Sequence, residues 1–214
     1  MSERLILHEY AASGNCYKVR LTAAHAGVAL ERRDYDIMKG ETRTPEFLAE
    51  VDANGRIPVL QVGDRFLPES NAACFYLASG SPLVPADHFD QADMLRWMFW
   101  EQYHHEPNIA TLRFWLRSVG LKQLTGLQRD QIAGKRLAGQ AALEVMDRHL
   151  SGREWFVGDQ MTLADICLFA YTHVADEADF DLSLYPEVNR WIERIISDPA
   201  TVPFKSELVL ALGA

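Results

Sequence analysis

Short apolar runs alternate with polar turns over the first third of the chain, which indicates a mixed α/β unit. Leu5–Leu7 is a short apolar run followed by a glycine-containing polar turn, as is typical of a buried strand. After this turn, apolar residues recur at helical spacing until Gly27, which predicts a helix that ends there. A second strand is expected over residues 29–37, with Tyr35 and Ile37 on one face.

Four further elements are expected before residue 80. They are a short helix, two strands and a second helix, over residues 45–51, 57–62, 65–67 and 69–78. Thr44 is a suitable N-cap for the short helix, and Pro45 suits its first position. Gly63-Asp64 is a tight hairpin signal between the two strands. A parallel pair joined by a helix, followed by an antiparallel hairpin, predicts a small mixed sheet in the order βαβαββα.

Strand signals disappear after residues 79–85, a stretch dense in glycine, serine and proline. We therefore expect a first domain over residues 1–80, a linker over 81–87 and an all-helical domain over 88–214. The helical domain is expected to contain a long helix interrupted at Pro107 and three more helices, over 124–150, over 163–175 and from Pro186. Thr162 and Asp165 have the spacing of a capping box, and the helix they open is apolar nearly all round, so it should lie at the domain's centre.

The composition is that of a folded globular protein and excludes a chain that is mainly disordered. Of the 214 residues, 48% are hydrophobic and 10% aromatic. The net charge of -9 argues against a nucleic-acid binder and against docking on an anionic membrane. The three cysteines are far apart and fit neither a disulfide framework nor a zinc site, and we expect no metal. Because we find no targeting signal and no apolar run near the ~20 residues of a membrane span, we expect a cytoplasmic protein.

The turn at residues 13–16 places polar groups where a strand leads into a helix. The N-terminus of a helix favours an anion, through its free N–H groups and its dipole. A hydroxyl group such as that of Ser13 can also donate a hydrogen bond to a thiolate and so lower the pKa of the thiol. The alternative is that Ser13 or Asn15 only caps the helix.

Two other turns carry groups that suit a ligand. Pro58 lies at the start of a predicted strand, and proline has no N–H to donate to a neighbouring strand. We therefore expect either an edge strand or a special turn, and a cis Ile57–Pro58 bond is one possible form of that turn. Ser70 offers a hydroxyl and a backbone N–H at a helix start, which suits a carboxylate, whereas Glu69 suits an ammonium group. Capping is again the alternative. The three turns could converge at the carboxyl ends of the strands, where ligands bind in such sheets.

Taken together, these segments resemble the cytosolic glutathione transferases over nearly the whole chain, from about Arg4 to about Phe204. The matching segments are residues 7–20 with Tyr10-Ala11-Ala12-Ser13-Gly14-Asn15-Cys16, Arg56-Ile57-Pro58-Val59-Leu60, Pro68-Glu69-Ser70, and Thr162-Leu163-Ala164-Asp165. The resemblance implies an N-terminal thioredoxin-like domain, a C-terminal helical bundle and a homodimer.

The resemblance also implies roles around the glutathione thiol. The Ser13 hydroxyl would stabilise the thiolate, as in the serine-type classes, and Asn15 would assist it. Ile57 would bond the cysteinyl backbone of glutathione through its own main chain, held by a cis bond to Pro58.

The two ends of glutathione are assigned by the same resemblance. Glu69 and Ser70 would hold the γ-glutamyl end. Arg56 would approach the glycine carboxylate, together with Arg43 or Thr42.

Cys16 lies where a Cys-x-x-Cys redox motif has its second cysteine, and Ser13 replaces the first. Serine cannot be the nucleophile of disulfide chemistry, so the reacting thiol must come from a cosubstrate. Cys16 is therefore expected to be structural. Tyr10 is a second candidate for the thiolate donor, but it lies inside or just after the first strand, so we favour Ser13.

An electrophile pocket is expected between the domains. Its predicted lining combines Tyr10 with residues of the long helix, namely Tyr103 and Glu106 together with Trp97, Ile109 and Arg113. The alternative for an aromatic stripe of this kind is an ordinary core.

These observations predict an enzyme that activates glutathione as a thiolate, either for conjugation to a small electrophile or for reduction of a hydroperoxide. The alternatives are a glutathione-dependent isomerase, a disulfide reductase, or a non-catalytic glutathione-transferase-like binding module. Gly14 and Asn15 replace a serine and a cysteine of the zeta-class isomerase motif, which disfavours the isomerase. We expect no nucleic-acid and no membrane partner.

Overall fold

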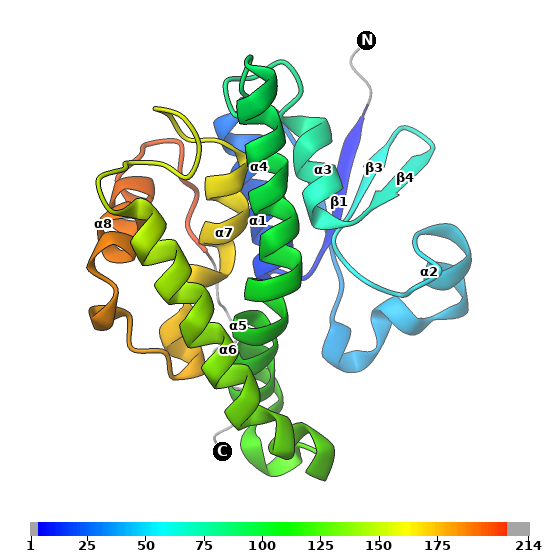
Figure 1. The fold of residues 1–214 in the computed structure, drawn as a ribbon. Helices are drawn as coiled ribbons and strands as arrows, with labels where there is room; N and C mark the ends of the chain where they lie inside the picture. Colours follow the sequence, from blue (N-terminus) through cyan, green and yellow to red (C-terminus); the bar gives the residue numbers. More distant parts are fainter. Residues whose placement is uncertain (1–3, 205–214) are drawn as a thin grey trace. The chain divides into compact units, whose positions relative to one another are not determined.

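The computed structural model describes residues 4–204, which form two compact units (Figure 1). The first unit holds the residues up to Leu83 together with those from Ala200, and the second unit holds Val84–Pro199. The sequence pattern does not predict that the segment from Ala200 joins the first unit. Tyr17 anchors this segment, because its hydroxyl donates a hydrogen bond of 2.8 Å to the carbonyl of Val202 and its ring contacts Phe204.

The first unit is built on a four-stranded mixed sheet in the order β2-β1-β3-β4. The strands are β1 (Leu5–Glu9), β2 (Glu31–Asp34), β3 (Val59–Val62) and β4 (Arg65–Pro68). β1 and β2 are parallel and are joined through helix α1 (Gly14–His25), whereas β3 is antiparallel to both β1 and β4. Helix α3 (Ser70–Leu77) follows β4 and packs against α1. The predicted fold class of this unit, α/β with thioredoxin-like topology, is confirmed.

The strand register brings the three candidate turns to one edge of the sheet. His8 in β1 lies opposite Val59 in β3, and Val59 lies opposite Pro68 in β4. The residues that follow His8, precede Val59 and follow Pro68 therefore leave the sheet at the same edge. The turn after β1, the Ile57–Pro58 bond and the start of α3 are thus neighbours in space.

Two expectations for this unit are corrected by the structure. β2 ends at Asp34, and Ile37 lies in a 3-10 turn because Asp36 caps that turn through the N–H groups of Met38 and Lys39. The edge-strand alternative for Pro58 is also wrong, because β3 is an inner strand. The Ile57–Pro58 bond is cis, so the special turn is the correct alternative.

Local signals define the short helix and the hairpin as expected. Helix α2 (Pro45–Glu50) begins with Pro45, and Thr44 Oγ accepts a hydrogen bond of 3.2 Å from the N–H of Phe47. Gly63 opens the hairpin turn between β3 and β4 with a φ of 57°, a conformation that glycine adopts without steric cost.

The second unit is helical. Its main helices are α4 (His88–Trp100), α5 (Glu106–Arg113), α6 (Gly126–Leu150), α7 (Leu163–Thr172) and α8 (Pro186–Ile196). A wider π turn over Glu101–His105 separates α4 from α5 just before Pro107, which has no N–H to offer to a regular helical turn. The predicted interruption is therefore confirmed. Within residues 4–204, none of the helices has the length and apolar character needed to cross a bilayer.

Helix α7 lies at the centre of the second unit, and every one of its residues is buried. The predicted capping box is present: Thr162 accepts from the N–H of Ala164, and Asp165 Oδ2 accepts from the N–H of Thr162. Asp165 Oδ1 also accepts from the N–H of Phe156 and from the indole N–H of Trp191 in α8, each at 3.0 Å. One carboxylate therefore ties the helix start to a loop and to a second helix.

Candidate active site

Ser13 is the N-cap of α1, and its local geometry follows from the turn after β1. Its backbone is extended, its N–H donates to the carbonyl of Tyr10 at 2.9 Å, and its Oγ accepts from the N–H of Cys16 at 3.3 Å. The Oγ bond uses a lone pair of the oxygen and not its proton. The capping alternative is thus observed, but it leaves the hydroxyl able to donate to an anion placed at the helix start.

Asn15 and Ser70 link the start of α1 to the start of α3. The Oγ of Ser70 donates to Oδ1 of Asn15 at 3.3 Å. Ser70 is buried, whereas Asn15 is partly exposed. The two turns that the sequence assigns to the thiol and to the γ-glutamyl end are therefore in direct contact.

Lys18 is a residue of this cluster that the sequence analysis missed. It is fully buried, and its Nζ donates to Oδ1 of Asn71 at 2.8 Å and to Oγ of Ser70 at 3.4 Å. A signal for it exists in the sequence, since Asn15, Lys18 and Thr22 follow one another at intervals of three and four residues along one face of α1.

Glu69 has an unusual backbone conformation at the end of β4. Its φ of 71° and ψ of 110° place a non-glycine residue in a region that side chains disfavour. Such conformations persist where the surrounding structure dictates them, and they concentrate at ligand sites. The side chain of Glu69 makes no capping bond to α3 and is exposed, so its carboxylate faces solvent at the helix start.

The turn before the cis bond brings together the candidates for the glycine carboxylate. The N–H of Arg56 donates to Oδ2 of Asp52 at 3.0 Å, and Nη1 of Arg43 donates to the carbonyl of Asn54 at 2.7 Å. Gly55 has a φ of 61°, and a Cβ atom there would lie 2.7 Å from the carbonyl oxygen of Thr42. Only glycine fits this close approach, which holds the turn against the segment of Thr42 and Arg43.

Cys16 is enclosed below the Ser13 turn. Burial raises the pKa of its thiol to about 12, and its Sγ accepts from the N–H of Tyr10 at 3.4 Å. A thiol with this pKa is protonated near neutral pH and is a poor nucleophile. The expectation that Cys16 is structural agrees with this environment. Tyr10 directly follows β1, as anticipated.

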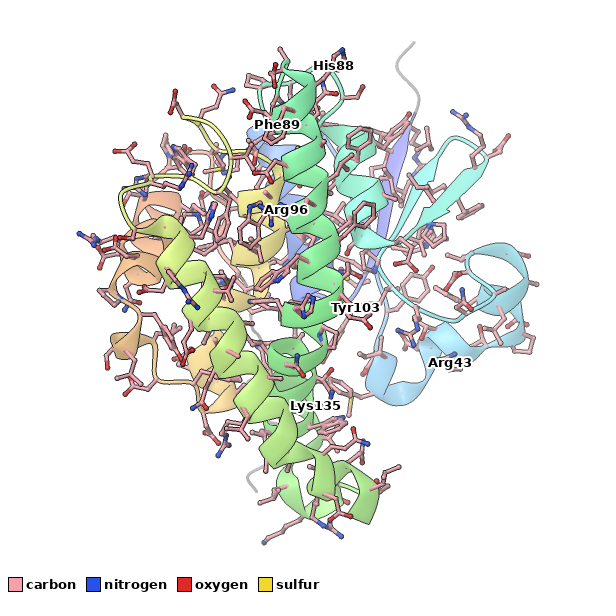
Figure 2. The ribbon with its side chains drawn as sticks, in the orientation of Figure 1. Arg43, His88, Phe89, Arg96, Tyr103 and Lys135 are labelled. Atoms are coloured by element: carbon pink, nitrogen blue, oxygen red, sulfur yellow. The ribbon has the colours of Figure 1, made fainter. Side chains whose placement is uncertain are left out.

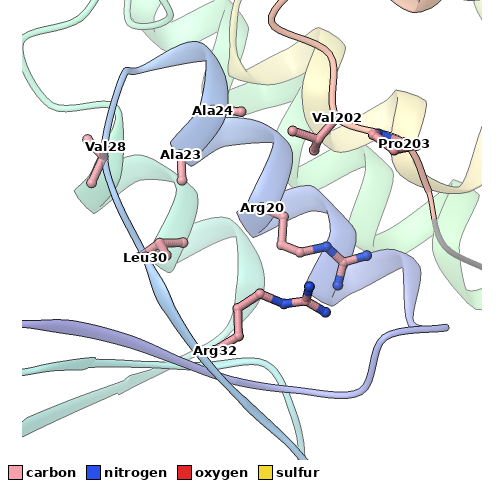
Figure 3. A pocket seen from close by; sticks show the side chains of 8 residues that line it. All are labelled: Arg20, Ala23, Ala24, Val28, Leu30, Arg32, Val202 and Pro203. Carbon is pink, nitrogen blue, oxygen red and sulfur yellow. The ribbon is translucent and has the colours of Figure 1, made fainter.

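A buried ion-pair cluster, also missed in the sequence analysis, supports the loop that carries Ser13. The carboxylate of Glu9 is fully enclosed and pairs with both Arg20 and Arg32. Arg20 also donates to the carbonyl of Ala11 at 3.2 Å, so α1 is fastened to the loop after β1. Figure 3 shows both arginine side chains beside a pocket of about 300 Å³. Among the described residues, its lining includes no predicted site residue.

The residues predicted for the electrophile pocket have different environments. Tyr103 is 79% exposed on the π turn (Figure 2), and Glu106 accepts a hydrogen bond from Gln102. Trp97 and Ile109 are buried, so the core alternative fits both. Arg113 is paired with Glu177 at 2.7 Å within the second unit. Tyr10 belongs to the first unit, and the electrophile pocket stays a prediction.

Among residues 4–204, no group of three or more His, Cys, Asp or Glu side chains is arranged to hold a metal ion. The absence of a metal stays a prediction.

The mixed sheet with a cis-proline before β3, followed by a helical unit, defines a class of proteins with a thioredoxin-like first domain. Comparison with known proteins specifies the class further. Residues 4–79 match the glutathione S-transferase N-terminal domain, and residues 128–199 match the glutathione S-transferase C-terminal domain. The chain belongs to the glutathione S-transferase family.

Individual relatives agree with this assignment. A structure from Rhodopseudomonas palustris, described as a possible glutathione S-transferase, is 42% identical with a TM-score of 0.88, covering 94% of this chain and 90% of that one. A glutathione S-transferase structure from Pseudomonas fluorescens is 40% identical with a TM-score of 0.87, covering 94% and 98%. The Escherichia coli protein named disulfide-bond oxidoreductase YfcG is 27% identical over 200 residues, covering 90% of each chain.

Proposed function

We propose that this protein is a glutathione transferase in which the hydroxyl of Ser13 donates a hydrogen bond to the thiolate of bound glutathione. The observation that carries the proposal is the meeting of two helix starts at one sheet edge, with Ser70 Oγ 3.3 Å from Asn15 Oδ1. Ser13 caps the helix that carries Asn15. Two adjacent helix N-termini suit a ligand that presents a thiolate and a carboxylate, because both groups are anions.

The energy needed for thiolate formation is within reach of these groups. An unperturbed cysteine thiol has a pKa of about 8.5, and lowering it by ~2 units requires about 2.7 kcal/mol. A hydrogen bond to a charged group contributes roughly 1.5–3 kcal/mol, and a helix N-terminus adds about 0.3–1 kcal/mol. Together these contributions amount to about 1.8–4 kcal/mol, a range that includes the required energy, and Asn15 would supply an additional amide donor.

In this proposal the reacting sulfur belongs to glutathione and not to the chain. All three cysteines are buried, and the thiol of Cys16 has a pKa of about 12. The glutathione thiolate attacks an electrophilic carbon, a C–S bond forms, and the leaving group departs with the bonding electron pair. With a hydroperoxide, the thiolate attacks the terminal oxygen, an S–O bond forms as the O–O bond breaks, and the alcohol leaves. A second glutathione thiol then displaces water from the resulting sulfenic acid, which gives glutathione disulfide.

The remaining groups hold the ligand in place. The peptide groups of Ile57 precede the ladder that begins at Val59 and would bond the cysteinyl backbone. Glu69 would receive the ammonium group and Ser70 the carboxylate of the γ-glutamyl end. Arg56, with the neighbouring Arg43 and Thr42, would approach the glycine carboxylate, as the contacts of the preceding turn support.

A homodimer is part of the proposal, and the exposed face of α3 supports it. Phe75 and Tyr76 are 44% and 41% exposed and line an apolar groove with Leu67 and Ala72. Exposed apolar surface of this kind is typical of an interface. Sedimentation should give the mass of a dimer for the wild type and of a monomer for Phe75→Asp. A wild type that sediments as a monomer would remove this part of the proposal.

The role of Ser13 is tested by an ultraviolet difference titration of bound glutathione, which reports the thiolate. The wild type should bind glutathione and show thiolate at neutral pH. Ser13→Gly and Ser13→Ala should both bind and lose most of the thiolate signal and turnover, because each lacks the hydroxyl. Glycine keeps most of the N-cap stability, whereas alanine loses about 1 kcal/mol of it. If both variants lose activity to the same extent, the loss comes from the missing hydroxyl and not from a weakened helix start. Ser13→Thr, which keeps a hydroxyl, should retain part of the signal.

The outcomes distinguish the functional alternatives. Unchanged thiolate in both variants would transfer the donor role to Tyr10 or Asn15. A wild type that does not bind glutathione would favour the non-catalytic binding module and would turn the search to protein partners.

A second candidate activity is glutathione-dependent disulfide reduction, which the name of the Escherichia coli relative favours. Since Ser13 stands where a redox cysteine would act, bound glutathione would itself form the mixed disulfide with the substrate. One substrate thiol leaves when this mixed disulfide forms. A second glutathione would then attack the glutathione sulfur of the mixed disulfide, which releases the other substrate thiol and forms glutathione disulfide. Reduction of a small model disulfide in excess glutathione tests this activity, and no rate above the uncatalysed reaction would exclude it.

A further inference from the structure

A chain of three hydrogen bonds crosses the sheet of the first unit and ends at Tyr35. Gln61 in β3 donates through Nε2 to the carbonyl of Gly63 at 2.9 Å, and its Oε1 lies 2.9 Å from Nε2 of His8 in β1. The other ring nitrogen of His8, Nδ1, lies 2.8 Å from the hydroxyl of Tyr35, which directly follows β2. Because His8 is only 1% exposed, both of its ring nitrogens bond to protein groups in place of water.

The direction of each hydrogen bond in this chain follows from its first member. The amide nitrogen of Gln61 donates to Gly63, so the amide oxygen accepts the Nε2 proton of His8. Burial lowers the pKa of His8, which favours the neutral ring, and a neutral imidazole carries a single N–H. Nδ1 of His8 is therefore an acceptor, and the hydroxyl of Tyr35 donates to it. Replacing Tyr35 by phenylalanine would remove the donor of this buried acceptor.

Tyr35 joins the chain of hydrogen bonds to residues 36–56, which we call the α2 lobe. The α2 lobe contains α2 and extends from the sheet (Figure 1). The ring of Tyr35 meets the ring of Phe47 in α2 edge to face, with the centroids 5.0 Å apart and the planes at 83°. Such a geometry is favourable for aromatic pairs, and it is enclosed here because Phe47 is only 3% exposed. The Tyr35 ring is thus held by His8 through its hydroxyl and by α2 through its edge contact.

Phe47 leads in turn to the residues that are assigned to the glycine carboxylate. Its carbonyl accepts from the N–H of Asp52 at 3.1 Å, and the carboxylate of Asp52 accepts from the N–H of Arg56 at 3.0 Å. Arg43, in the same lobe, donates to the carbonyl of Asn54 at 2.7 Å. These groups are therefore held to one another within the α2 lobe, and the aromatic contact joins the lobe to the sheet.

We propose that His8 and Tyr35 are positioning residues for recognition of the glycine carboxylate of glutathione. Their hydrogen bond fixes the Tyr35 ring against α2 and so keeps Arg56 and Arg43 in place beside the cis Ile57–Pro58 bond. Without this hydrogen bond the α2 lobe adopts other orientations, and the apparent affinity falls with the fraction of molecules that have the lobe in place. The inference rests on the proposed function, since it takes glutathione as the ligand of the site.

The test compares glutathione with γ-glutamylcysteinylglycinamide, the same peptide with its glycine carboxylate replaced by an uncharged amide. Dissociation constants are measured by calorimetry for the wild type, Tyr35→Phe, His8→Leu and His8→Asn. Phenylalanine keeps the ring and its contact with Phe47 but lacks the hydroxyl. Leucine and asparagine are similar in size, and only asparagine offers an acceptor near the position of Nδ1. Tyr17→Phe is the matched control, because it removes a hydroxyl with an equally short hydrogen bond of 2.8 Å, to Val202 in the same unit and outside the α2 lobe.

Tyr35→Phe and His8→Leu should each bind glutathione about fivefold more weakly than the wild type, the effect of losing one neutral hydrogen bond. Both should bind the amide peptide within about twofold of the wild type, because that peptide lacks the carboxylate that the α2 lobe recognises. His8→Asn should recover most of the affinity for glutathione. The double variant of Tyr35→Phe and His8→Leu should lose no more affinity than either single variant, since both substitutions remove the same hydrogen bond. In turnover, KM for glutathione should rise while kcat stays within about twofold, and Tyr17→Phe should match the wild type toward both peptides.

Four results would overturn the assignment. Equal glutathione affinity in the wild type, Tyr35→Phe and His8→Leu would remove the positioning role and leave the proposed function intact. Equal weakening toward both peptides would identify a general structural role. A wild type with equal affinity for the two peptides would show that the α2 lobe does not recognise the carboxylate, and the role of Ser13 would be unaffected. A wild type that binds neither peptide would refute the proposed function and the assignment of His8 and Tyr35 together.

Discussion

Helix α6 contains two glycines that should respond to the same substitution with opposite signs. Gly134 is exposed, and a Cβ atom added there would meet no atom within 4 Å. Gly139 is buried, and a Cβ atom there would lie 2.7 Å from Cε1 of Phe180, closer still to Cζ, and 3.3 Å from Cγ1 of Ile109. Gly139 thus allows α6 to approach a ring that is itself only 3% exposed.

The magnitudes follow from helix propensity and from packing. Replacing glycine by alanine inside a helix gains about 0.8–1 kcal/mol at either position. Gly134→Ala should keep this gain. At Gly139 the enclosed ring of Phe180 must move, and overpacking of a core costs typically 1–3 kcal/mol. Contacts this short place the cost near the upper end of that range, so we expect Gly139→Ala to destabilise by about 1–2 kcal/mol.

The assay is urea unfolding followed by circular dichroism, with Gly134→Ala as the matched control. The midpoints should shift in opposite directions. A double-mutant cycle with Phe180→Leu should show favourable coupling of roughly 1 kcal/mol, because the smaller side chain makes room for the new methyl group. If Gly139→Ala is as stabilising as Gly134→Ala, the close packing of α6 on Phe180 is refuted.

Three further predictions follow from buried groups. Burial lowers the pKa of His173 to about 4 from an ordinary 6.5. As pH falls, the unfolded chain therefore binds a proton at this histidine before the folded chain does. The stability that neutral His173 contributes is fully present above pH 6.5 and is lost as pH falls toward 4. The loss is at most about 3 kcal/mol. Measured by urea unfolding from pH 7 to 4, the free energy of unfolding should decline less steeply for His173→Gln than for the wild type. Parallel declines would contradict this role of His173. Because all three cysteines are buried and the thiol of Cys16 has a pKa of about 12, the native protein should not react with a thiol reagent near neutral pH, and prompt labelling of any cysteine would contradict this. Asp165→Ala leaves the N–H donors of Phe156, Thr162 and Trp191 without their acceptor. It should lower the free energy of unfolding by roughly 3–5 kcal/mol, against about 1–2 kcal/mol for Trp191→Phe. Equal effects of the two substitutions in urea unfolding would show that the carboxylate does not link these groups.

Elements with local signals could be predicted from the sequence. Thr44 and Pro45 mark the start of α2, and Gly63-Asp64 marks the hairpin, because capping and turn conformations depend on a few adjacent residues. The capping box of Thr162 and Asp165 is equally local. The alternating pattern predicts an end of β2 that is too late, since the pattern continues past the point where Asp36 opens a turn.

Features that depend on tertiary contacts could not be predicted in the same way. A lysine and a glutamate inside an apolar pattern normally indicate exposed positions, yet Lys18 and Glu9 are fully buried. Their partners Asn71 and Arg32 lie 53 and 23 residues away along the chain. The spacing of Trp97 is compatible with both a pocket and a core, and in the second unit its ring packs against His149 and Phe156. Helical spacing identifies a buried face without saying what that face contacts.

Glu9 and Lys18 are both buried beside the candidate site, and each joins different elements of the first unit. Glu9 lies between two guanidinium groups, so its charge is compensated within the folded chain, and its removal would leave Arg20 nearly buried without its counter-charge. Its interactions therefore belong to folding, and they hold the loop that carries Ser13 through the bond from Arg20 to Ala11. Lys18 donates hydrogen bonds to Ser70 and Asn71 at the start of α3, so this buried side chain links α1 to α3 and holds the start of α3 beside the turn that carries Ser13.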